Sequence, residues 1–236
     1  MTTRQPAQPV EHRQFRFRAP PGSTEVLLVR HGESAPARED RPFPLVGGHG
    51  DPPLSPEGRW QAEQLGMRLA GERVDAIYVT TLRRTVETAQ PLAQRLGITP
   101  LVEPDLREVY LGEWEGGMLR IMAARRDPRF VAAMEAEDWG LIPGAETNDQ
   151  LRARVMPALD RIARAHPDER VVVVAHGGVI GCALATVTGS RPFAFAGSDN
   201  GSISHLVAIG DRWVLRRFND TGHLAGELSV AGEPPT

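Results

Sequence analysis

The chain has 236 residues, 41% of them hydrophobic, and this length can bury one sizeable core, so we expect a single globular domain. A formal net charge of -3 gives no reason to expect nucleic acid or an anionic membrane surface as the main partner, and no stretch predicts a membrane-spanning helix or a signal peptide. The single cysteine, Cys182, excludes an intrachain disulfide framework and a multi-cysteine zinc site and favours a cytoplasmic protein.

The two ends of the chain differ in composition from its centre. Residues 1–22 are rich in Pro, Gln and Arg, and residues 223–236 show little apolar periodicity. We therefore expect an N-terminal arm and a C-terminal tail around a central domain, 23–222. The Arg- and Phe-rich run 13–18 is compatible with a nucleic-acid-binding or partner-binding arm. We favour a segment that lies on the domain surface or at a dimer contact, which leaves a homodimer open.

Short β-branched runs alternate with helical patterns along the central domain. Val26–Arg30, Asp75–Thr80 and Val171–Ala175 are predicted strands, because unbroken apolar runs suit a sheet that is covered on both faces. Ser202–Ile209 and Trp213–Phe218, separated by Gly-Asp-Arg, predict a late hairpin. The alternation indicates an α/β protein with a mostly parallel central sheet joined by crossover helices.

Helix boundaries are indicated by capping residues and prolines. Ser55 is followed by a proline and an apolar periodicity, which predicts a helix N-terminus. Thr81 is a candidate cap for a second helix, and we expect Pro91 to kink or end it. A third helix is opened by residue 147 or 148 and runs towards residue 166, with a bend expected at Pro157.

Two histidines follow buried strands directly. Arg30 and His31 stand at the end of the first strand, and His176 stands at the end of the strand at 171–175. Gly177 then leads into a predicted helix at 179–188, whose N-terminus offers free backbone N–H groups. Because the carboxyl ends of parallel strands meet at one edge of a sheet, where open α/β folds bind ligands, we expect the two imidazoles to lie close together.

A second guanidinium and a carboxyl group come to the same edge from two other segments. Arg84 follows the strand at 75–80, and Glu108 follows an extended segment at 99–104. The remaining histidines show no metal-ligand spacing. The sequence therefore predicts neither a metal nor another cofactor at this site.

This set of groups suits phosphoryl transfer. The planar guanidiniums of Arg30 and Arg84 would bind the oxygens of a phosphate monoester in charge-assisted hydrogen bonds. Imidazole is a nucleophile only when neutral, so His31 needs one ring N–H held by a neighbour, such as a backbone carbonyl, and its other nitrogen aimed at phosphorus. His176 and the N–H of Gly177 would donate to the phosphate oxygens as charge shifts during transfer.

Glu108 supplies the proton in this scheme. Its carboxyl group would protonate the leaving alkoxide, and the negative charge of the bound phosphate would favour the protonated form that this step needs. The resulting carboxylate would then deprotonate water. Glu113 and Glu115 lie nearby in the sequence and stay open as alternatives for the acid or for an ion pair with Arg107.

Four motifs in this order resemble the histidine phosphatase superfamily, also called the phosphoglycerate mutase-like family. They are Arg30-His31-Gly32-Glu33, Leu82 with Arg84 and Thr88-Ala89, Glu108 followed by Gly112-Glu113-Trp114-Glu115-Gly116, and His176-Gly177-Gly178. The resemblance covers roughly residues 26–187 and implies a three-layer α/β/α sandwich and a metal-independent enzyme. It also implies a phosphohistidine at His31, phosphate contacts from Arg30, Arg84 and His176, and a proton donor at Glu108.

Several positions depart from the family pattern. Residues 34–37 lack the asparagine that touches the phosphate in many members, which leaves open whether Ser34 or another group makes that contact. Thr80-Thr81 stands where Ser-Pro is usual, and Gly181 stands where an arginine is common. None of these changes removes a catalytic group.

We favour a phosphatase that acts on small phosphate monoesters over a phosphoglycerate mutase. Such mutases carry Tyr, Arg and Lys residues for the glycerate carboxylate after the acid, and residues 118–141 show no such motif. Its arginines could contact an anionic substrate, but solvated helix charges are the simpler interpretation; they are Arg120, Arg125, Arg126 and Arg129. A non-catalytic phospho-ligand binding module would not need Glu108. The substrate stays open among sugar phosphates, phosphoglycerates, nucleotides and phosphoproteins, because segments 35–53 and 110–142 decide how the pocket is covered.

Overall fold

A six-stranded sheet with the order β5-β4-β6-β1-β7-β8 forms the centre of the computed structural model, which describes residues 12–224. Its strands are β1 Thr24–Arg30, β4 Ala76–Val79, β5 Leu101–Val102, β6 Arg170–Ala175, β7 Ile203–Ile209 and β8 Arg212–Asp220. The pairs from β5 to β1 are parallel, and the hairpin β7–β8 adds antiparallel to β1. The predicted mostly parallel sheet and late hairpin are confirmed.

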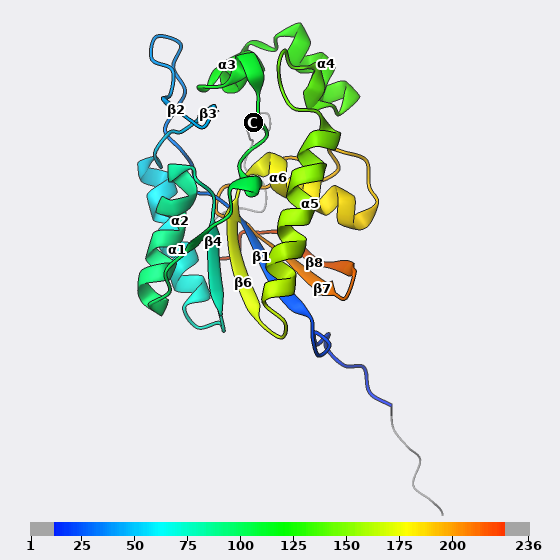
Figure 1. Ribbon diagram of the computed structural model, residues 1–236. Helices are drawn as coiled ribbons and strands as arrows, with labels where there is room; N and C mark the ends of the chain where they lie inside the picture. The colour runs from blue at the N-terminus through cyan, green and yellow to red at the C-terminus, as the bar shows by residue number, and fades with distance from the viewer. Residues whose placement is uncertain (1–11, 225–236) are drawn as a thin grey trace, which may run out of the picture.

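Helices cover both faces of this sheet and its carboxyl edge. They are α1 Pro56–Leu69, α2 Arg83–Leu96, α3 Met118–Arg125, α4 Pro128–Ala136, α5 Asn148–Ala165 and α6 Gly177–Thr188. The short elements are β2 Leu45–Val46, β3 His49–Gly50 and the 3₁₀ helices η1 Pro104–Leu106, η2 Gly112–Trp114 and η3 Trp139–Leu141. Figure 1 shows α1 and α2 on one side of the sheet, α5 on the other, and α3 and α4 beyond the carboxyl ends of the strands.

Alternating side chains of the parallel strands build the two layers of the core, because successive residues of a strand point to opposite faces. Leu27 and Val29 of β1 pack in the cluster that contains Leu65 of α1. Val26 and Leu28 pack in the cluster on the other face, with α5 and α6. The α/β/α sandwich that the sequence resemblance implies is the observed fold.

Helix starts follow the predicted capping chemistry in α1 and α5 but not in α2. The Ser55 hydroxyl accepts from the Gly58 N–H at 3.0 Å, and Thr147 forms a reciprocal capping box with Gln150. α2 begins instead after Leu82, which makes no side-chain cap. The prediction of Thr81 as the cap was therefore wrong.

Pro91 and Pro157 lie inside α2 and α5, and neither proline ends its helix. A proline removes one backbone donor from a helix, whereas packing of the apolar face against the sheet stabilises many turns at once. Leu92 and Leu159, close to the two prolines, are 1% and 0% exposed. Of the two outcomes expected at Pro91, a kink or an end of the helix, the second is not observed.

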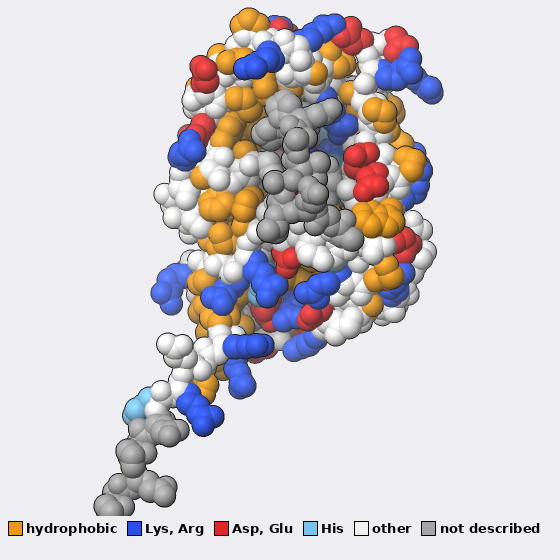
Figure 2. Space-filling model, turned by 180° about the vertical axis from the view of Figure 1, so that it is seen from behind, with side chains coloured by type: hydrophobic (Ala, Val, Ile, Leu, Met, Phe, Trp, Pro, Cys, Tyr) orange, Lys and Arg blue, Asp and Glu red, His pale blue; other side chains and the backbone are white. Residues whose placement is uncertain are grey.

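The described part of the N-terminal segment, residues 12–20, forms neither helix nor strand. The guanidinium of Arg216 in β8 lies 4.0 Å from the centre of the Phe17 ring, whereas Phe15 is 90% exposed. Figure 2 shows basic side chains gathered where this segment leaves the domain. Residues 1–11 of the predicted arm and 225–236 of the predicted tail lie outside the described residues. No helix between residues 12 and 224 is long and apolar enough to cross a membrane.

The loop after β1 docks directly on the first turn of α1, where glycines permit backbone contact. A Cβ atom added at Gly58 would lie 1.9 Å from the Glu33 carbonyl oxygen, and one added at Gly32 would lie 2.5 Å from the Gly58 carbonyl oxygen. Both distances are well inside van der Waals contact. This close approach fixes where the chain runs immediately after β1.

Gly58→Ala should therefore destabilise the protein, because the added methyl group forces the β1 loop away from α1. We expect the free energy of unfolding to fall by about 1–3 kcal/mol, measured by urea denaturation. Gly71→Ala is the matched control, since a Cβ there meets nothing within 4 Å. Equal stability of the two variants would contradict this account of the docking.

Candidate active site

The parallel pairing of β1 with β6 brings His31 and His176 together at the carboxyl edge of the sheet. Arg30 pairs with Ala175 in register, and the His31 N–H donates to the Ala175 carbonyl at 3.0 Å. The imidazole ring centres lie 5.2 Å apart. Both side chains are buried, at 4% and 0% exposure.

The hydrogen bonds of His31 define its tautomer. Nδ1 lies 2.7 Å from the carbonyl oxygen of Gly32, so the proton is on Nδ1. Nε2 accepts from Nε of Arg84 at 3.1 Å, and a guanidinium nitrogen can only donate. Nε2 therefore carries a lone pair. Burial, together with the positive charges of Arg84 and Arg30, holds the pKa of His31 well below its ordinary value of 6.5.

His176 occupies the N-cap position of α6. Its Nε2 lies 3.1 Å from the Thr80 hydroxyl, and its buried Nδ1 has no hydrogen-bond partner among the described residues. Burial and the charge of Arg84 lower the pKa of His176. Thr80, which departs from the usual family residue, thus orients this imidazole, and Nδ1 stays available to a ligand.

Arg30 and Arg84 reach the imidazoles from β1 and α2. Arg30 donates through Nη1 to the Ser198 carbonyl, and Arg84 donates through Nη1 to the Gly50 carbonyl at 2.9 Å. Burial lowers the pKa of Arg84 to about 10, so this guanidinium stays charged near neutral pH. Within residues 12–224 the Arg84 guanidinium hydrogen-bonds to neutral acceptors, the His31 imidazole and the Gly50 carbonyl, so its charge is available to an anion.

Arg120 is a third cation at the site, contrary to its interpretation as a solvated helix charge. It lies on α3 and donates to the Ser34 hydroxyl at 2.6 Å and to the Ala35 carbonyl at 3.0 Å. Its positive charge contributes to the lowered pKa of His31 and of Arg84. No local pattern in the sequence indicates this approach, because it depends on how α3 packs over the sheet edge.

Glu108 lies at the N-terminus of α6. Its Oε1 accepts from the N–H groups of Gly178 at 3.1 Å and Val109 at 2.9 Å. A Cβ at position 178 would lie 2.7 Å from that oxygen, so a larger residue there would displace the Glu108 carboxylate. The charge of Glu108 acts on both Arg30 and Arg84, which places the carboxyl group beside the cationic pocket.

Arg154, which the sequence reasoning did not identify, holds the segment that carries Glu108. From α5, its guanidinium donates to the carbonyls of residues 105 and 107, each at 2.7 Å, and of Glu108 at 2.9 Å. It also pairs with Glu146 at 2.5 Å, whose carboxylate accepts from the Tyr110 N–H at 2.7 Å. The Arg154–Glu146 pair thus holds the backbone on both sides of Glu108.

Glu113 and Glu115 are the alternatives to Glu108 as the proton donor, and their surroundings differ from those of Glu108. Glu113 is exposed. Glu115 accepts from the backbone N–H groups of Gly50 at 2.7 Å and Leu111 at 3.0 Å, and burial raises its pKa. Glu115 therefore ties β3 to the loop after Glu108. Among residues 12–224, no three His, Cys, Asp or Glu side chains form a group that could hold a metal ion.

Comparison with known proteins assigns the family. Residues 26–221 match the model of the histidine phosphatase superfamily, branch 1, and the chain belongs to this superfamily. It is 34% identical over 206 residues to phosphoglycerate mutase-like protein 4 of Arabidopsis thaliana, covering 85% of this chain and 86% of that protein. It is 32% identical to the metal-independent phosphoserine phosphatase of the same plant, covering 86% and 84%.

A solved relative has the same architecture. The structure of a mycobacterial glucosyl-3-phosphoglycerate phosphatase superposes with a TM-score of 0.68 at 28% identity, covering 83% of this chain and 98% of that chain. The relatives thus include both phosphatases and a protein named for its likeness to mutases. The choice between these activities has to come from the site itself.

The buried imidazoles make the stability of the protein depend on pH. Because the pKa values of His31 and His176 are lowered, the unfolded chain binds protons below pH 6.5 that the folded chain does not. The free energy of unfolding should fall as the pH drops from 7.5 to 5, by up to about 1.4 kcal/mol per pH unit for each such histidine. Chemical denaturation at a series of pH values measures this slope.

In the double variant His31→Gln and His176→Gln, the free energy of unfolding should depend less steeply on pH. A His12→Gln variant, changed at an exposed position, should keep the original pH dependence. Some slope remains in the double variant, because burial also lowers the pKa of His49, His205 and His223. An unchanged slope in the double variant would show that these two imidazoles are not held neutral by burial.

Proposed function

We propose that the protein hydrolyses small phosphate monoesters through a covalent phosphohistidine on His31. The observation that carries this proposal is that His31 Nε2 is unprotonated. It accepts a hydrogen bond from Arg84 and is surrounded by positive charge. The oxygens of a dianionic phosphoryl group would accept hydrogen bonds from the donors of that pocket. Family membership, with relatives named as phosphatases, supports the same conclusion.

Phosphate binding uses the donors that the pocket offers. Arg30 and Arg84 bind the phosphoryl oxygens through charge-assisted hydrogen bonds, and His176 donates through the ring nitrogen that lacks a partner. The N–H of Gly177, at the start of α6, adds the positive end of a helix dipole. We infer that Ser34, whose hydroxyl accepts from Arg120, makes the phosphate contact for which many family members use an asparagine.

The reaction then proceeds in two half-reactions. Nε2 of His31 forms a bond to phosphorus while the bond from phosphorus to the ester oxygen breaks, and the leaving oxygen takes a proton from Glu108. Water next attacks the phosphohistidine and transfers a proton to the Glu108 carboxylate. The nitrogen–phosphorus bond breaks, inorganic phosphate is released, and His31 and Glu108 return to their starting states.

A phosphoglycerate mutase would instead return the phosphoryl group to another hydroxyl of the same substrate. Arg120 favours this alternative, because it adds a cation that could bind a carboxylate. Two of its five N–H groups, however, already donate to Ser34 and Ala35, and residues 118–141 lack the Tyr, Arg and Lys motif that such mutases use for the glycerate carboxylate. We therefore rank hydrolysis first.

The activity test is phosphate release from p-nitrophenyl phosphate at mildly acidic pH in the presence of a metal chelator. We expect turnover by the unmodified protein and none by His31→Ala, with His12→Ala, an exposed histidine, as the matched control. Full activity of His31→Ala would overturn the mechanism. A parallel assay with 3-phosphoglycerate decides the alternative, since rapid isomerisation with little phosphate release would identify a mutase.

Glu108→Gln separates the two roles of the acid. A nitrophenolate leaves without needing a proton, so this variant should release one equivalent of nitrophenol per enzyme in a burst and then turn over slowly, because water is no longer deprotonated. With an alkyl phosphate, both the phosphorylation of His31 and the hydrolysis of the phosphohistidine are slow in this variant. We expect the rate of phosphate release to fall by about 10²–10⁴-fold, with no burst. Stopped-flow absorbance and phosphate release measure the two phases.

Glu113→Gln is the matched control, because Glu113 is a nearby exposed carboxylate. It should behave as the unmodified protein with both substrates. If Glu108→Gln retains full rates while a Glu115→Gln variant loses them, the acid is Glu115.

A further inference from the structure

An apolar cleft of about 320 Å³ opens beside the cationic pocket. Arg30, Glu108 and Gly177 line it, whereas His31, Arg84 and His176 do not. Its volume is at the lower end of the range of about 300–1,000 Å³ typical of small-molecule sites. The cleft therefore adjoins the candidate active site at Glu108, the proposed acid.

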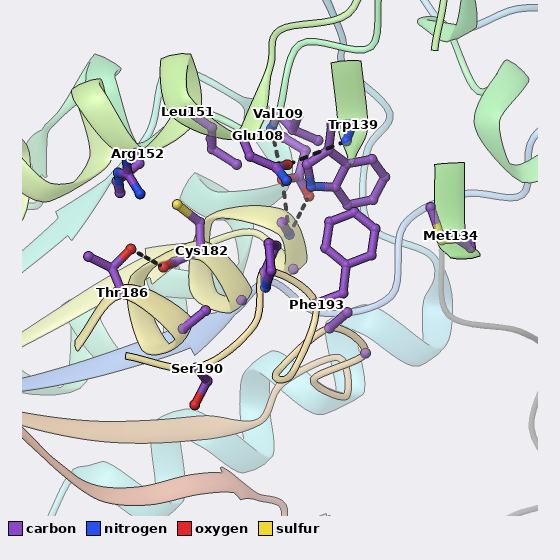
Figure 3. A pocket seen from close by; sticks show the side chains of 18 of the residues that line it. Glu108, Val109, Met134, Trp139, Leu151, Arg152, Cys182, Thr186, Ser190 and Phe193 are labelled. Atoms are coloured by element: carbon purple, nitrogen blue, oxygen red, sulfur yellow. Dashed lines mark hydrogen bonds between the residues drawn. The ribbon is translucent and has the colours of Figure 1, made fainter. Parts of the chain in front are cut away.

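The rest of the cleft wall is mostly apolar. The rings of Trp139 and Phe193 lie 4.8 Å apart at a tilt of 42°, and Figure 3 shows them facing each other next to Glu108. Other apolar lining residues are Met134, Leu151, Cys182 and Ala185. Burial raises the pKa of Cys182 to about 11, so this thiol stays neutral near neutral pH.

Among the described lining residues, the charged side chains are Arg30, Glu108 and Arg152. Arg30 and Glu108 belong to the candidate active site. Arg152 is exposed and pairs with Asp149 at 3.0 Å. The uncharged polar lining side chains already make hydrogen bonds within the protein: Asn148 to Trp139 and Glu137, Thr186 to Cys182, and Ser190 to Thr188. A polyhydroxylated or carboxylated group against the Trp139 and Phe193 rings would lose hydration and gain few hydrogen-bond partners, which is unfavourable.

The direction of phosphoryl transfer indicates where the alcohol part of the substrate lies relative to this cleft. In an in-line displacement the leaving oxygen lies on the far side of phosphorus from the attacking nitrogen, here Nε2 of His31. Glu108 must reach that oxygen to protonate it. The alcohol part of the ester therefore continues past Glu108, which is where the cleft begins.

We propose that this cleft binds the alcohol part of the substrate, and that this alcohol is apolar and carries an aromatic ring. This inference rests on the proposed phosphatase activity. Trp139 and Phe193 offer a pair of rings against which a substrate ring can pack. The substrate class is then an arylalkyl phosphate rather than a sugar phosphate, a phosphoglycerate or phosphoserine.

The test compares kcat/KM for 3-phenylpropyl phosphate and glycerol 1-phosphate, which share a primary alkyl ester bond. We expect a preference for the phenylpropyl ester of at least about tenfold. Trp139→Ala should reduce this preference severalfold, because it removes one of the paired rings. Trp60→Ala is the matched control, since Trp60 lies on α1 outside the cleft and is 40% exposed, and it should keep the full preference.

A second variant keeps the test valid if Trp139→Ala does not fold. Thr186 is exposed and lines the cleft, so Thr186→Glu introduces a negative charge there without disturbing the core. It should also reduce the preference. Equal kcat/KM for the two esters, or an unchanged preference in both cleft variants, would overturn the proposal and leave the phosphatase activity standing.

A binding measurement keeps the two proposals distinguishable. Calorimetric titration with 3-phenylpropylphosphonate and methylphosphonate, which cannot be hydrolysed, needs no catalysis. Tighter binding of the phenylpropyl compound, reduced by Trp139→Ala, supports the cleft even if no ester is turned over, in which case the proposed function fails alone. Equal binding of the two phosphonates contradicts the cleft proposal.

Discussion

The parallel pairing of β1 with β6 is the interaction on which the site depends. It ends two buried strands side by side, so that His31 and His176 follow them into the same small volume. Both imidazoles are buried there, and burial disfavours their charged forms. Neutral imidazoles give one nucleophilic nitrogen and one uncharged donor, which is the combination that phosphoryl transfer through histidine requires. The strand pairing thus determines chemistry as well as architecture.

Positive charge reaches this pocket from elements that are far apart in the sequence. Arg84 comes from α2 and Arg120 from α3, and burial lowers the pKa of both without neutralising the surplus of cations. Glu108 stands at the border of that charged pocket, fixed by the N-terminus of α6 and by Arg154. On its other side the apolar cleft begins. In the proposed reaction, a proton donor at this border would have the phosphoryl group on one side and the departing alcohol on the other.

The sequence predicted the parts of the fold that depend on local patterns. Buried strands, the late hairpin and the caps of α1 and α5 follow from periodicity and capping chemistry, and the strand ends placed His31 and Glu108 at one sheet edge. Interactions that depend on packing were not accessible in this way. Arg120 and Arg154 look like ordinary helix arginines in the sequence, and only the packing of α3 and α5 shows that they reach Ser34 and the backbone around Glu108. The cleft was invisible for the same reason, because its walls come from segments between residues 108 and 197.

The most direct test of the account is detection of the covalent intermediate. The protein is mixed with p-nitrophenyl phosphate, quenched with alkali, under which phosphohistidine is stable, and digested for mass spectrometry. The account predicts one added phosphoryl group, on His31, accumulating further in Glu108→Gln. Steady turnover with no phosphoryl group on His31, or with the group on His176, would contradict it.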